Sequence, residues 1–426
     1  MKKVSFHTLG CKVNFAETST LARGFASAGF ERVGEGAAAD VCVINSCSVT
    51  AHADKKCRNL IGKLRRLSPR AVIVVTGCYA QLQPEAVGAI EGVDFVFGNN
   101  FKSDIVGVVT AALAKKGVES DATEIKACPY SEIDNFFGAW SAGDRTRAFL
   151  KVQDGCDYRC AYCTIHYARG HSRNIPIARA VEEARQIASR GIKEIVVTGI
   201  NTGDFGRTTG ESFIDLLRAL DTVEGIERYR ISSIEPNLLS DKVIDFCARS
   251  TKFQPHFHIP LQSGSDRILG LMRRRYTTAR FAERVERVRE VMPDTFFGID
   301  VIVGFPGETD DDFETTYRFL EKLAPAYLHV FPFSERPGTP AVDLPDKVPP
   351  RVTAERAARL GELCQRLHRQ FAERFVGTEA VVLFEGSRKD GMMSGFTGNY
   401  IKVSAPYDAA LVNTLVPVTL SREQLK

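Results

Sequence analysis

Residues 149–163 read FLKVQDGCDYRCAYC, a short apolar run followed at once by three cysteines, Cys156, Cys160 and Cys163. With three and then two residues between them, these cysteines let one short loop hold a metal cluster on three thiolates. The loop supplies no fourth cysteine, so one metal position stays open for another ligand. This stretch therefore predicts an iron–sulfur site with a free coordination position, directly after a strand.

Zinc is the alternative metal for this loop. Tetrahedral zinc takes four ligands, and His166 or His171 could complete a set with the three cysteines. A loop of an α/β barrel is an unusual place for a structural zinc ion, which favours the iron–sulfur interpretation.

Three further cysteines, Cys11, Cys47 and Cys78, each follow an apolar, strand-like run in the first eighty residues. Strands are expected at residues 4–9, 41–45, 71–76 and 95–97, and helices at 16–28, 51–67, 85–90 and 103–114. This alternation predicts a small α/β domain with a parallel sheet. Because ligands of such sheets lie at the carboxyl ends of the strands, we expect the three cysteines to converge there on a second three-thiolate site.

A second βα series follows from about residue 145. Its expected strands are 148–152, 194–198, 229–233, 256–261, 297–305 and 327–333, with a long final helix at 353–375. Six strands with intervening helices predict a (βα)6 partial barrel, two units short of a full one. The pattern then changes to period-two strands at 379–384, 392–396, 400–403 and 412–420, which predict a small, oligonucleotide-binding type β-barrel. The predicted units are thus 1–114, a connector at 115–144, 145–375 and 376–426.

Composition limits the class of protein. The chain has 426 residues, 44% hydrophobic and 25% charged, as expected for a soluble protein of two or three domains. No apolar stretch approaches the roughly 18 residues that span a bilayer, and no secretory signal is visible, so we expect a cytoplasmic protein without a membrane partner. Eleven cysteines without a signal peptide favour metal ligation or buried thiols over disulfides. A net charge of +4 leaves any nucleic-acid binding to local basic faces.

Residues 150–170, LKVQDGCDYRCAYCTIHYARG, resemble the radical-SAM methylthiotransferases. The segments GCKVN at 10–14, NSCSVT at 45–50 and TGCYAQ at 76–81 match the N-terminal domain of that family. The last fifty residues look like its TRAM domain, an RNA-binding β-barrel. The resemblance covers nearly the whole chain.

The resemblance implies two [4Fe–4S] clusters, one on each cysteine triad, together with S-adenosylmethionine. In this family one S-adenosylmethionine donates a methyl group to sulfur at the auxiliary cluster on Cys11, Cys47 and Cys78. A second is cleaved to a 5′-deoxyadenosyl radical, and a methylthio group joins the substrate. Radical chemistry suits an aromatic C–H such as adenine C2, which is too weak an acid for a side-chain base.

Lys12 and Val13, directly after the first cluster cysteine, resemble the threonylcarbamoyladenosine tRNA branch of the family. The predicted substrate is therefore N6-threonylcarbamoyladenosine next to the anticodon of a tRNA. Isopentenyladenosine in tRNA and an aspartate of a ribosomal protein are the alternative substrates. A zinc-containing RNA-binding protein is the non-enzymatic alternative. The resemblance also implies a flavodoxin- or ferredoxin-type reductant, whereas the oligomeric state is not given by the sequence.

The radical-SAM core further implies contacts to S-adenosylmethionine from side chains at the carboxyl ends of the barrel strands. An aromatic ring inside the cysteine loop could pack on the adenine of the cofactor, although such a ring could equally belong to the core. For any one strand-end residue, a turn-forming or solvated role competes with direct contact. The predicted contacts are Tyr162, Thr198, Asn201, Ser232, Glu235, Gln262, Ser263 and Gly304.

Basic residues crowd three places that could reach RNA. The basic residues of segment 51–67, and the one just after it, lie largely on the outward face of a predicted helix. There, contact with RNA phosphates is favoured over simple solvation. These basic residues are Lys55, Lys56, Arg58, Lys63, Arg65, Arg66 and Arg70. Arg273, Arg274 and Arg275 form a second cluster, with at least one a candidate for the active site. In the last domain the predicted RNA contacts are Arg388, Lys389, Tyr400 and Lys402.

Overall fold

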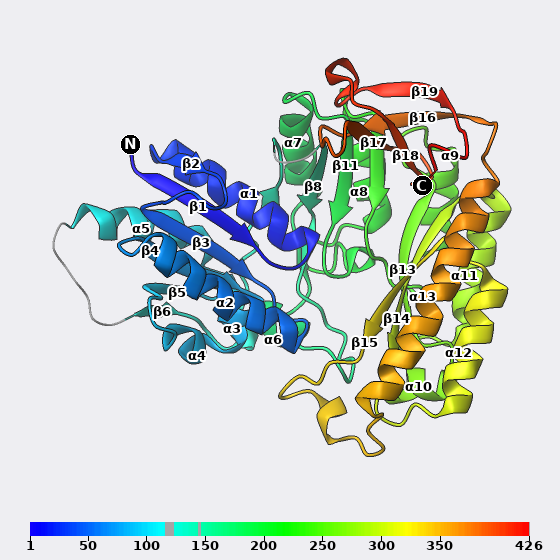
Figure 1. Ribbon diagram of the computed structural model, residues 1–426, viewed down its shortest axis with the longest axis horizontal. Coiled ribbons are helices and arrows are strands. Elements are labelled where there is room, and N and C mark those ends of the chain that lie inside the picture. The colour runs from blue at the N-terminus through cyan, green and yellow to red at the C-terminus, as the bar shows by residue number, and fades with distance from the viewer. Residues whose placement is uncertain (116–122, 144–145, 426) are drawn as a thin grey trace.

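The N-terminal part of the chain forms a parallel sheet with helices on both faces, seen on the left of Figure 1. Its strand order is β2-β1-β3-β4-β5-β6, and all neighbours run parallel. The strands are β1 (Lys3–Thr8), β2 (Glu31–Val33), β3 (Val41–Ser46), β4 (Val72–Gly77), β5 (Phe95–Phe97) and β6 (Glu124–Lys126). The helices are α1 (Lys12–Ser27), α2 (Ala51–Leu67), α3 (Cys78–Leu82), α4 (Pro84–Gly88) and α5 (Ile105–Ala114).

Alternate residues of the central strands divide between two cores. Val41 and Val43 of β3 pack with α1 and α5, whereas Cys42 and Ile44 pack with α2 and α3. Strands buried on both faces in this way read as continuous apolar runs, and such runs predicted the four inner strands correctly. The two missed strands, β2 and β6, are three residues long and charged, as is usual for sheet edges.

The computed structural model describes residues 1–115, 123–143 and 146–425. Residues 116–122 and 144–145 of the predicted connector therefore lie outside the described residues. The rest of the connector contributes an edge strand to each neighbouring sheet. β6 extends the N-terminal sheet, and β7 (Ala139–Trp140) pairs antiparallel with the first barrel strand.

The central part is a partial barrel of six parallel strands, as predicted. One sheet holds β8 (Arg147–Lys151), β11 (Glu194–Thr198) and β12 (Arg228–Ile231), and the other holds β13 (His256–Gln262), β14 (Phe296–Val303) and β15 (Tyr327–Pro332). Single bridges, Tyr229 to Phe253 and Ser233 to His258, join the two sheets into one curved wall. The covering helices are α7 (Ile177–Ala188), α8 (Phe213–Asp221), α9 (Asp241–Arg249), α10 (Asp266–Leu271), α11 (Thr278–Val291), α12 (Asp310–Leu323) and α13 (Pro350–Glu373).

The two faces of this wall differ sharply in polarity. Residues such as Ile195, Phe257 and Ile299 point outward into the large core beneath the helices. Their neighbours along the strands point inward, where Arg230, His258 and other polar side chains line a cavity. A closed (βα)8 barrel fills its interior with branched apolar side chains, so a polar interior indicates space kept for a polar ligand.

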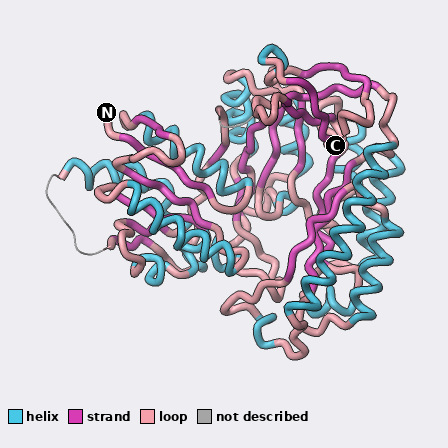
Figure 2. The backbone as a smooth tube through the Cα atoms, viewed as in Figure 1, coloured by secondary structure: helices cyan, strands magenta, loops and turns pink. Residues whose placement is uncertain are grey.

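The C-terminal part is a four-stranded antiparallel sheet in the order β18-β17-β16-β19. Its strands are the magenta segments near the top right of Figure 2. Its strands are β16 (Glu379–Phe384), β17 (Met392–Thr397), β18 (Lys402–Pro406) and β19 (Leu415–Thr419). Among the described strands, β18 and β19 are the two ends of the sheet and do not pair with each other. The predicted strands are confirmed, and closure into a barrel stays a prediction.

Two arginines of β12 fasten this sheet to the barrel. Arg228 donates to the carbonyl oxygens of Val381 (2.6 Å) and Phe396 (3.1 Å). Arg230 donates to those of Gly398 (2.7 Å) and Thr397 (2.8 Å). In the described part of the chain, no helix has both the length and the apolar character needed to cross a membrane.

Candidate iron–sulfur and cofactor sites

The loop with Cys156, Cys160 and Cys163 lies between β9 (Gln153–Asp154) and α6 (Ile165–Arg169). Backbone N–H groups point at two of its sulfurs, from Tyr158 to Cys156 and from Ile165 to Cys163, each at 3.4 Å. Such donors stabilise cluster thiolates and tune their potential. Burial, with smaller effects from its neighbours, raises the pKa of the Cys156 thiol to about 12, so the free thiol is neutral and a cationic metal must displace its proton.

The third sulfur of this loop has a charged donor. Arg274 lies 3.0 Å from the sulfur of Cys160 through Nη1 and 3.4 Å from the hydroxyl of Tyr162. The same guanidinium pairs with the carboxylate of Glu235. The sequence expectation that one residue of the 273–275 cluster serves the active site is therefore met by Arg274.

Cys11, Cys47 and Cys78 meet at the carboxyl edge of the N-terminal sheet, as expected. Cys11 directly precedes α1, Cys47 follows β3, and Cys78 opens α3 after β4. Burial and the adjacent Cys78 thiol raise the pKa of Cys47 to about 12. Gly10 is left-handed (φ +102°), and a Cβ there would lie 2.8 Å from the sulfur of Cys47. Glycine is thus required for the Cys11 and Cys47 loops to touch.

The spacing of the sulfurs tests which metal group these triads fit. Zinc–sulfur bonds of 2.3 Å in a tetrahedron place the sulfurs about 3.8 Å apart. Among the described residues, the set that brings three metal-ligating atoms within 4.8 Å of one another is His258, Asp300 and His329, and neither cysteine triad does so. The cysteines therefore fit a larger cluster better than a single zinc ion.

The two histidines of the zinc alternative have other surroundings. His171 is 58% exposed and lies 2.9 Å from Asp157. The ring of His166 is buried against Tyr167, and its nitrogens have no hydrogen-bond partner. Burial and the charge of Arg159 lower the pKa of His166 to about 4. Neither ring joins the cysteines in a close set of ligands.

Some predicted cofactor contacts line or adjoin cavities. Tyr162 and Gln262 line a cavity of about 240 Å³ beside Cys163, which Val49 and Thr50 of the N-terminal domain also border. Asn201 is buried, and both its side-chain amide nitrogen and oxygen lack a partner. Ser232 has a buried hydroxyl without a partner as well. Unpaired buried polar atoms are costly and are expected where a polar ligand binds.

Three of the predicted contacts are placed differently. Ser263 is fully buried, and its hydroxyl lies 3.3 Å from that of Thr316. It lines neither the small cavity nor the larger, polar cavity inside the barrel. At Gly304 (φ +76°) a Cβ would meet Thr353 of α13 at 2.2 Å, so this glycine serves a turn and close helix packing. Thr198 is buried at the end of β11 and lines neither of these cavities.

A buried ion network missed by the sequence analysis connects the two triads. Glu17 of α1 pairs with Lys102, with Lys151 (2.8 Å) and with Arg169 (3.0 Å). Asp154 of the radical-SAM loop pairs with Arg169 (2.9 Å) and Lys151 (2.6 Å). Burial alone raises the pKa of Glu17, but the neighbouring cations outweigh it and hold the pKa well below its ordinary value. Burial raises the pKa of the Cys78 thiol, and the neighbouring charge of Arg169 partly offsets that rise.

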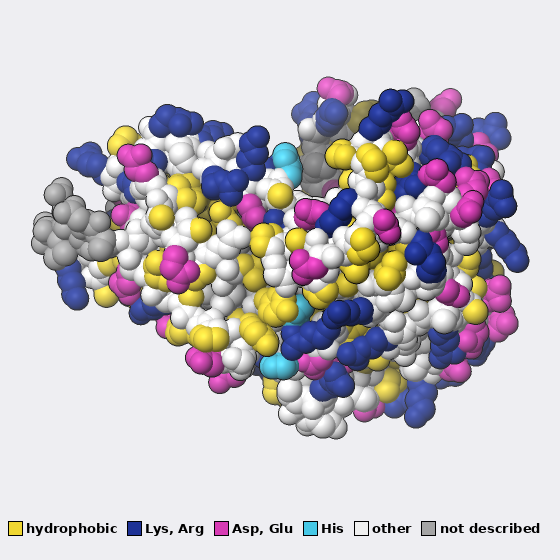
Figure 3. Space-filling view, turned by 90° about the horizontal axis from the view of Figure 1, so that it is seen from below, with side chains coloured by type: hydrophobic (Ala, Val, Ile, Leu, Met, Phe, Trp, Pro, Cys, Tyr) yellow, Lys and Arg dark blue, Asp and Glu magenta, His cyan; other side chains and the backbone are white. Residues whose placement is uncertain are grey.

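A second connection joins the domains near the small cavity. Arg336 donates to the hydroxyl of Ser48 and pairs with Asp54, both at 2.7 Å. Ser48 directly follows Cys47, so the segment after Cys47 is held against the segment after β15. Figure 3 shows hydrophobic side chains gathered where the two halves of the molecule meet, with Lys and Arg side chains beside them.

A larger cavity of about 750 Å³ extends from Gly10 and Cys11 to the C-terminal sheet. Tyr400 lines it, stacked on Phe396 with ring centroids 4.8 Å apart and accepting a hydrogen bond from Arg147 (3.1 Å). Its left-handed backbone (φ 63°) turns the ring toward the barrel. Contact between Tyr400 and RNA stays a prediction.

The basic face of α2 is present as predicted. Cys57, Ile61 and Leu64 form its buried side. Arg65 differs from its neighbours because it pairs with Asp94 (3.0 Å) and donates to backbone carbonyls, which gives it a structural role. The exposed basic residues are Lys55, Lys56, Arg58, Lys63, Arg66 and Arg70.

Comparison with known proteins agrees with this arrangement. Residues 150–320 match the Radical SAM superfamily, and residues 3–98 match the uncharacterized protein family UPF0004. The threonylcarbamoyladenosine tRNA methylthiotransferase MtaB of Bacillus subtilis is 40% identical, over 99% of this chain and 94% of the relative. The chain belongs to the radical-SAM methylthiotransferase family. S-adenosylmethionine and a [4Fe–4S] cluster are therefore its cofactors.

Other family members are similar over comparable lengths. MtaB of Aquifex aeolicus is 38% identical over 94% of this chain and 96% of the relative. The tRNA-2-methylthio-N(6)-dimethylallyladenosine synthase of Thermobifida fusca is 35% identical over 92% and 80%. Among solved structures, the radical S-adenosylmethionine methyltransferase TsrM of Kitasatospora setae has a TM-score of 0.59 at 15% identity, covering 92% of this chain and 81% of that one. This last likeness supports the fold alone.

Proposed function

We propose that this methylthiotransferase adds a methylthio group to C2 of N6-threonylcarbamoyladenosine next to the anticodon of a tRNA. The observation that carries the proposal is full-length identity of 40% to a relative of that name, combined with two cysteine triads, each in loops that follow strands. The dimethylallyladenosine synthase of Thermobifida fusca, at 35% identity, is less similar than the Bacillus subtilis relative. The ribosomal-protein and zinc-protein alternatives are not favoured by these relatives or by the sulfur spacing.

The division of labour follows the two triads. Cys156, Cys160 and Cys163 are proposed to hold the cluster that works with S-adenosylmethionine, and Cys11, Cys47 and Cys78 an auxiliary [4Fe–4S] cluster. When bound, these groups supply radical hydrogen abstraction and the transferred sulfur. The protein orients them: Arg274 donates to Cys160, and Arg169 lies beside Cys78. A flavodoxin- or ferredoxin-type protein is the proposed electron donor.

Residues around the small cavity are proposed to bind S-adenosylmethionine. Tyr162 and Gln262 line this cavity beside Cys163. Asn201 and Glu235 follow the neighbouring strands, and Asn201 offers buried polar atoms without partners. Ser232 follows β12 as well, and its buried hydroxyl, also without a partner, lines the larger cavity.

The tRNA is proposed to enter where the two halves meet. Val49 and Phe331, 54% and 48% exposed, border the small cavity and offer apolar surface for an unstacked base. The exposed basic residues of α2 lie on the same domain as Cys47 and suit phosphate contact. On the C-terminal sheet, Arg388, Lys389 and Lys402 remain exposed. The proposed units are residues 1–114, 145–375 and 376–426, the last acting as an RNA-binding TRAM domain.

Mass spectrometry of tRNA nucleosides tests this function. A strain lacking the gene is expected to lose the methylthio mark on threonylcarbamoyladenosine and to regain it with the intact gene. The Cys160→Ala gene serves as the matched inactive control. A nucleoside profile that does not change on deletion would contradict the proposal.

A further inference from the structure

The 750 Å³ cavity behind Cys11 is lined by charged and imidazole side chains. Chemistry at adenine C2 alone does not require them. The volume of the cavity is that of a small-molecule site. Strands of the partial barrel, the start of α1 and the C-terminal sheet all contribute to its walls. It begins at Gly10 and Cys11, so whatever it holds lies next to the proposed auxiliary cluster.

The cavity is rich in positive charge. Among the described lining residues one is acidic, Glu35. The basic ones are Lys12, Arg32, Arg147, Arg230 and Lys402. Such an excess of cations in a hollow with low-dielectric walls attracts an anionic ligand.

The central cations differ in how they are paired. Arg147 pairs with Glu385 (2.9 Å), and Arg230 pairs with Glu194 (2.8 Å). Lys12 has no carboxylate within ion-pair distance among the described residues. Its side chain lines the cavity together with His256 and His329. Lys12 and Lys402 are the lining lysines without an ion pair among the described residues, and Lys12 is the one that adjoins Cys11.

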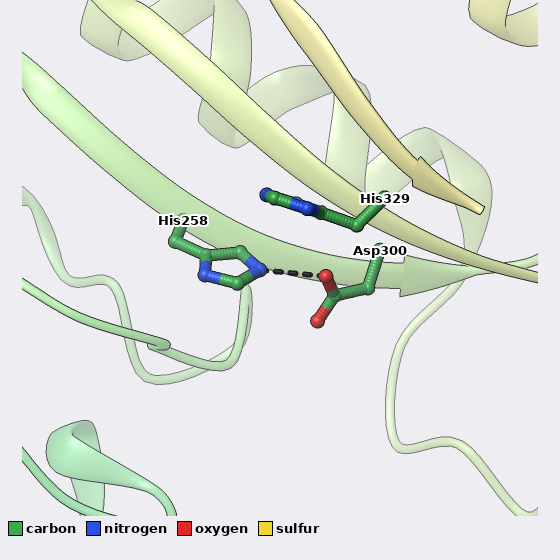
Figure 4. Close-up of side chains that lie close together, drawn as sticks. All are labelled: His258, Asp300 and His329. Carbon is green, nitrogen blue, oxygen red and sulfur yellow. Dashed lines mark hydrogen bonds and ion pairs between the residues drawn. The ribbon is translucent and has the colours of Figure 1, made fainter. Parts of the chain in front are cut away.

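Imidazole groups of β13 and β15 line the cavity together with Lys12. Figure 4 shows His258 of β13 hydrogen-bonded to Asp300 of β14 (2.6 Å), with His329 of β15 beside them. Asp300 and His329 are direct register partners. His256 adds a buried Nδ1 without a partner. Because Asp300 is already bonded to His258, its charge is partly balanced, and the free ring nitrogens remain for a polar ligand.

The substrate of the proposed function carries a matching group. Adenine C2 and N6 lie on the same edge of the base, separated only by N1 and C6. A base that presents C2 to sulfur near Cys11 must therefore place its N6 substituent close by. In threonylcarbamoyladenosine that substituent ends in a carboxylate and a hydroxyl, whereas a dimethylallyl group is wholly apolar.

We infer that this cavity receives the N6 substituent of the target adenosine and that Lys12 binds its carboxylate, with His329 beside it. The inference rests on the proposed function and names the residues that select the substrate. Lys12 is a specificity residue, because it contacts the substituent and not the reacting carbon. A site built for polar groups rejects an analogue that lacks them, since its own buried polar atoms then stay unpaired.

Binding of two forms of one tRNA tests the inference with the anaerobic holoenzyme. The probes are the same tRNA with and without the N6-threonylcarbamoyl group. The wild-type protein is expected to bind the modified form more tightly, and Lys12→Met to lose most of that preference. For the modified tRNA, kcat/KM should fall about 10- to 100-fold, the loss typical of one charge-assisted hydrogen bond. Lys322→Met, on the exposed last turn of α12, is the matched control and should keep the preference.

Two further measurements keep the test decisive. Because Lys12 adjoins Cys11, iron content and 5′-deoxyadenosine formation without tRNA are measured for each variant. If Lys12→Met loses iron, His329→Leu, which is not next to any triad cysteine in the sequence, must show the reduced preference with iron retained. Either variant keeping the wild-type preference would overturn the inference. So would a stoichiometric divalent metal lost in His329→Leu, because the carboxylate would then bind through a metal on His258, Asp300 and His329.

Failure of the proposed function looks different from failure of this inference. If the wild-type protein leaves threonylcarbamoyladenosine tRNA unconverted, the function is wrong. If the wild-type protein converts it and Lys12→Met discriminates equally well, only the assignment of the cavity is wrong.

Discussion

The two cysteine triads reach similar chemistry by opposite routes. Cys156, Cys160 and Cys163 belong to one loop, so local chain geometry alone brings them together. Cys11, Cys47 and Cys78 come from three loops and meet only when the parallel sheet has formed. The first site therefore depends on a short segment, whereas the second depends on a whole domain. The ion network around Glu17 and Arg169 joins them.

Removing one cysteine from each triad should give the largest effects and separate their roles. Cys160→Ala should abolish 5′-deoxyadenosine formation, because the radical chemistry starts there. Cys78→Ala should keep this cleavage and abolish methylthiolated product. Each variant should retain about half of the iron, measured together with both products.

Cys247→Ala is the matched control, since Cys247 is buried on α9 outside both triads. It should keep both activities at a stability cost of about 1 kcal/mol. Equal losses of cleavage in Cys160→Ala and Cys78→Ala would break the distinction between the triads.

Breaking the network between the triads should give the largest effect on stability. Arg169→Met leaves Glu17 and Asp154 with fewer cations in a fully buried site. Removing one partner of a buried ion pair costs about 3–5 kcal/mol. Denaturant unfolding of the anaerobic holoprotein measures this loss.

Arg218→Met provides the surface comparison, because Arg218 and Asp215 are 61% and 54% exposed in their pair. It should cost less than about 1 kcal/mol. Similar costs for the two variants would show that the network does not hold the domains together.

A smaller effect on cofactor cleavage is expected from changing one hydrogen-bond donor beside Cys160. Arg274→Gln removes the N–H group facing Cys160 and leaves Glu235 without its cation. Formation of 5′-deoxyadenosine should fall about tenfold, the equivalent of one hydrogen bond to a charged group. Arg275→Gln, which alters a donor to the carbonyl of Asp157, is the control and should change cleavage little. An unchanged rate in Arg274→Gln would remove this residue from the site.

The smallest expected effect is a dependence of stability on pH that comes from His166, close to Cys163 in the sequence. The pKa of His166 is lowered from 6.5 to about 4, so the unfolded chain binds the proton more tightly. Stability from the neutral ring is fully present above pH 6.5 and is lost as pH falls toward 4. Between pH 7.5 and 5.5 the wild-type protein should lose about 1 kcal/mol more than His166→Phe. Thermal unfolding at each pH measures this, with His52→Asn on the exposed face of α2 as control; equal slopes would contradict it.

Motifs and periodicity predicted much of this molecule. Apolar runs located the inner strands, and cysteines after those runs located both triads. β2 and β6 were missed because their short, charged sequences resemble loops. The network of Glu17, Lys102 and Arg169 could not be predicted, because its members lie far apart in sequence and meet only across a domain boundary.

The direction in which side chains point was the other feature that the sequence did not predict. Tyr400 was expected to contact RNA, and the structure shows that its backbone turns the ring into the cavity. Ser263 and Gly304 follow strands as cofactor contacts would, but one faces Thr316 and the other a helix. Lys12 was noticed only for its place beside Cys11, while the structure reveals what its side chain faces.

The hydrogen bonds from Arg228 and Arg230 to carbonyls of the C-terminal sheet have a mechanical consequence. These four bonds hold the sheet against the barrel where β12 begins, beside the larger cavity. If the sheet binds tRNA as proposed, the same bonds would fix how far the bound stem lies from the barrel strands.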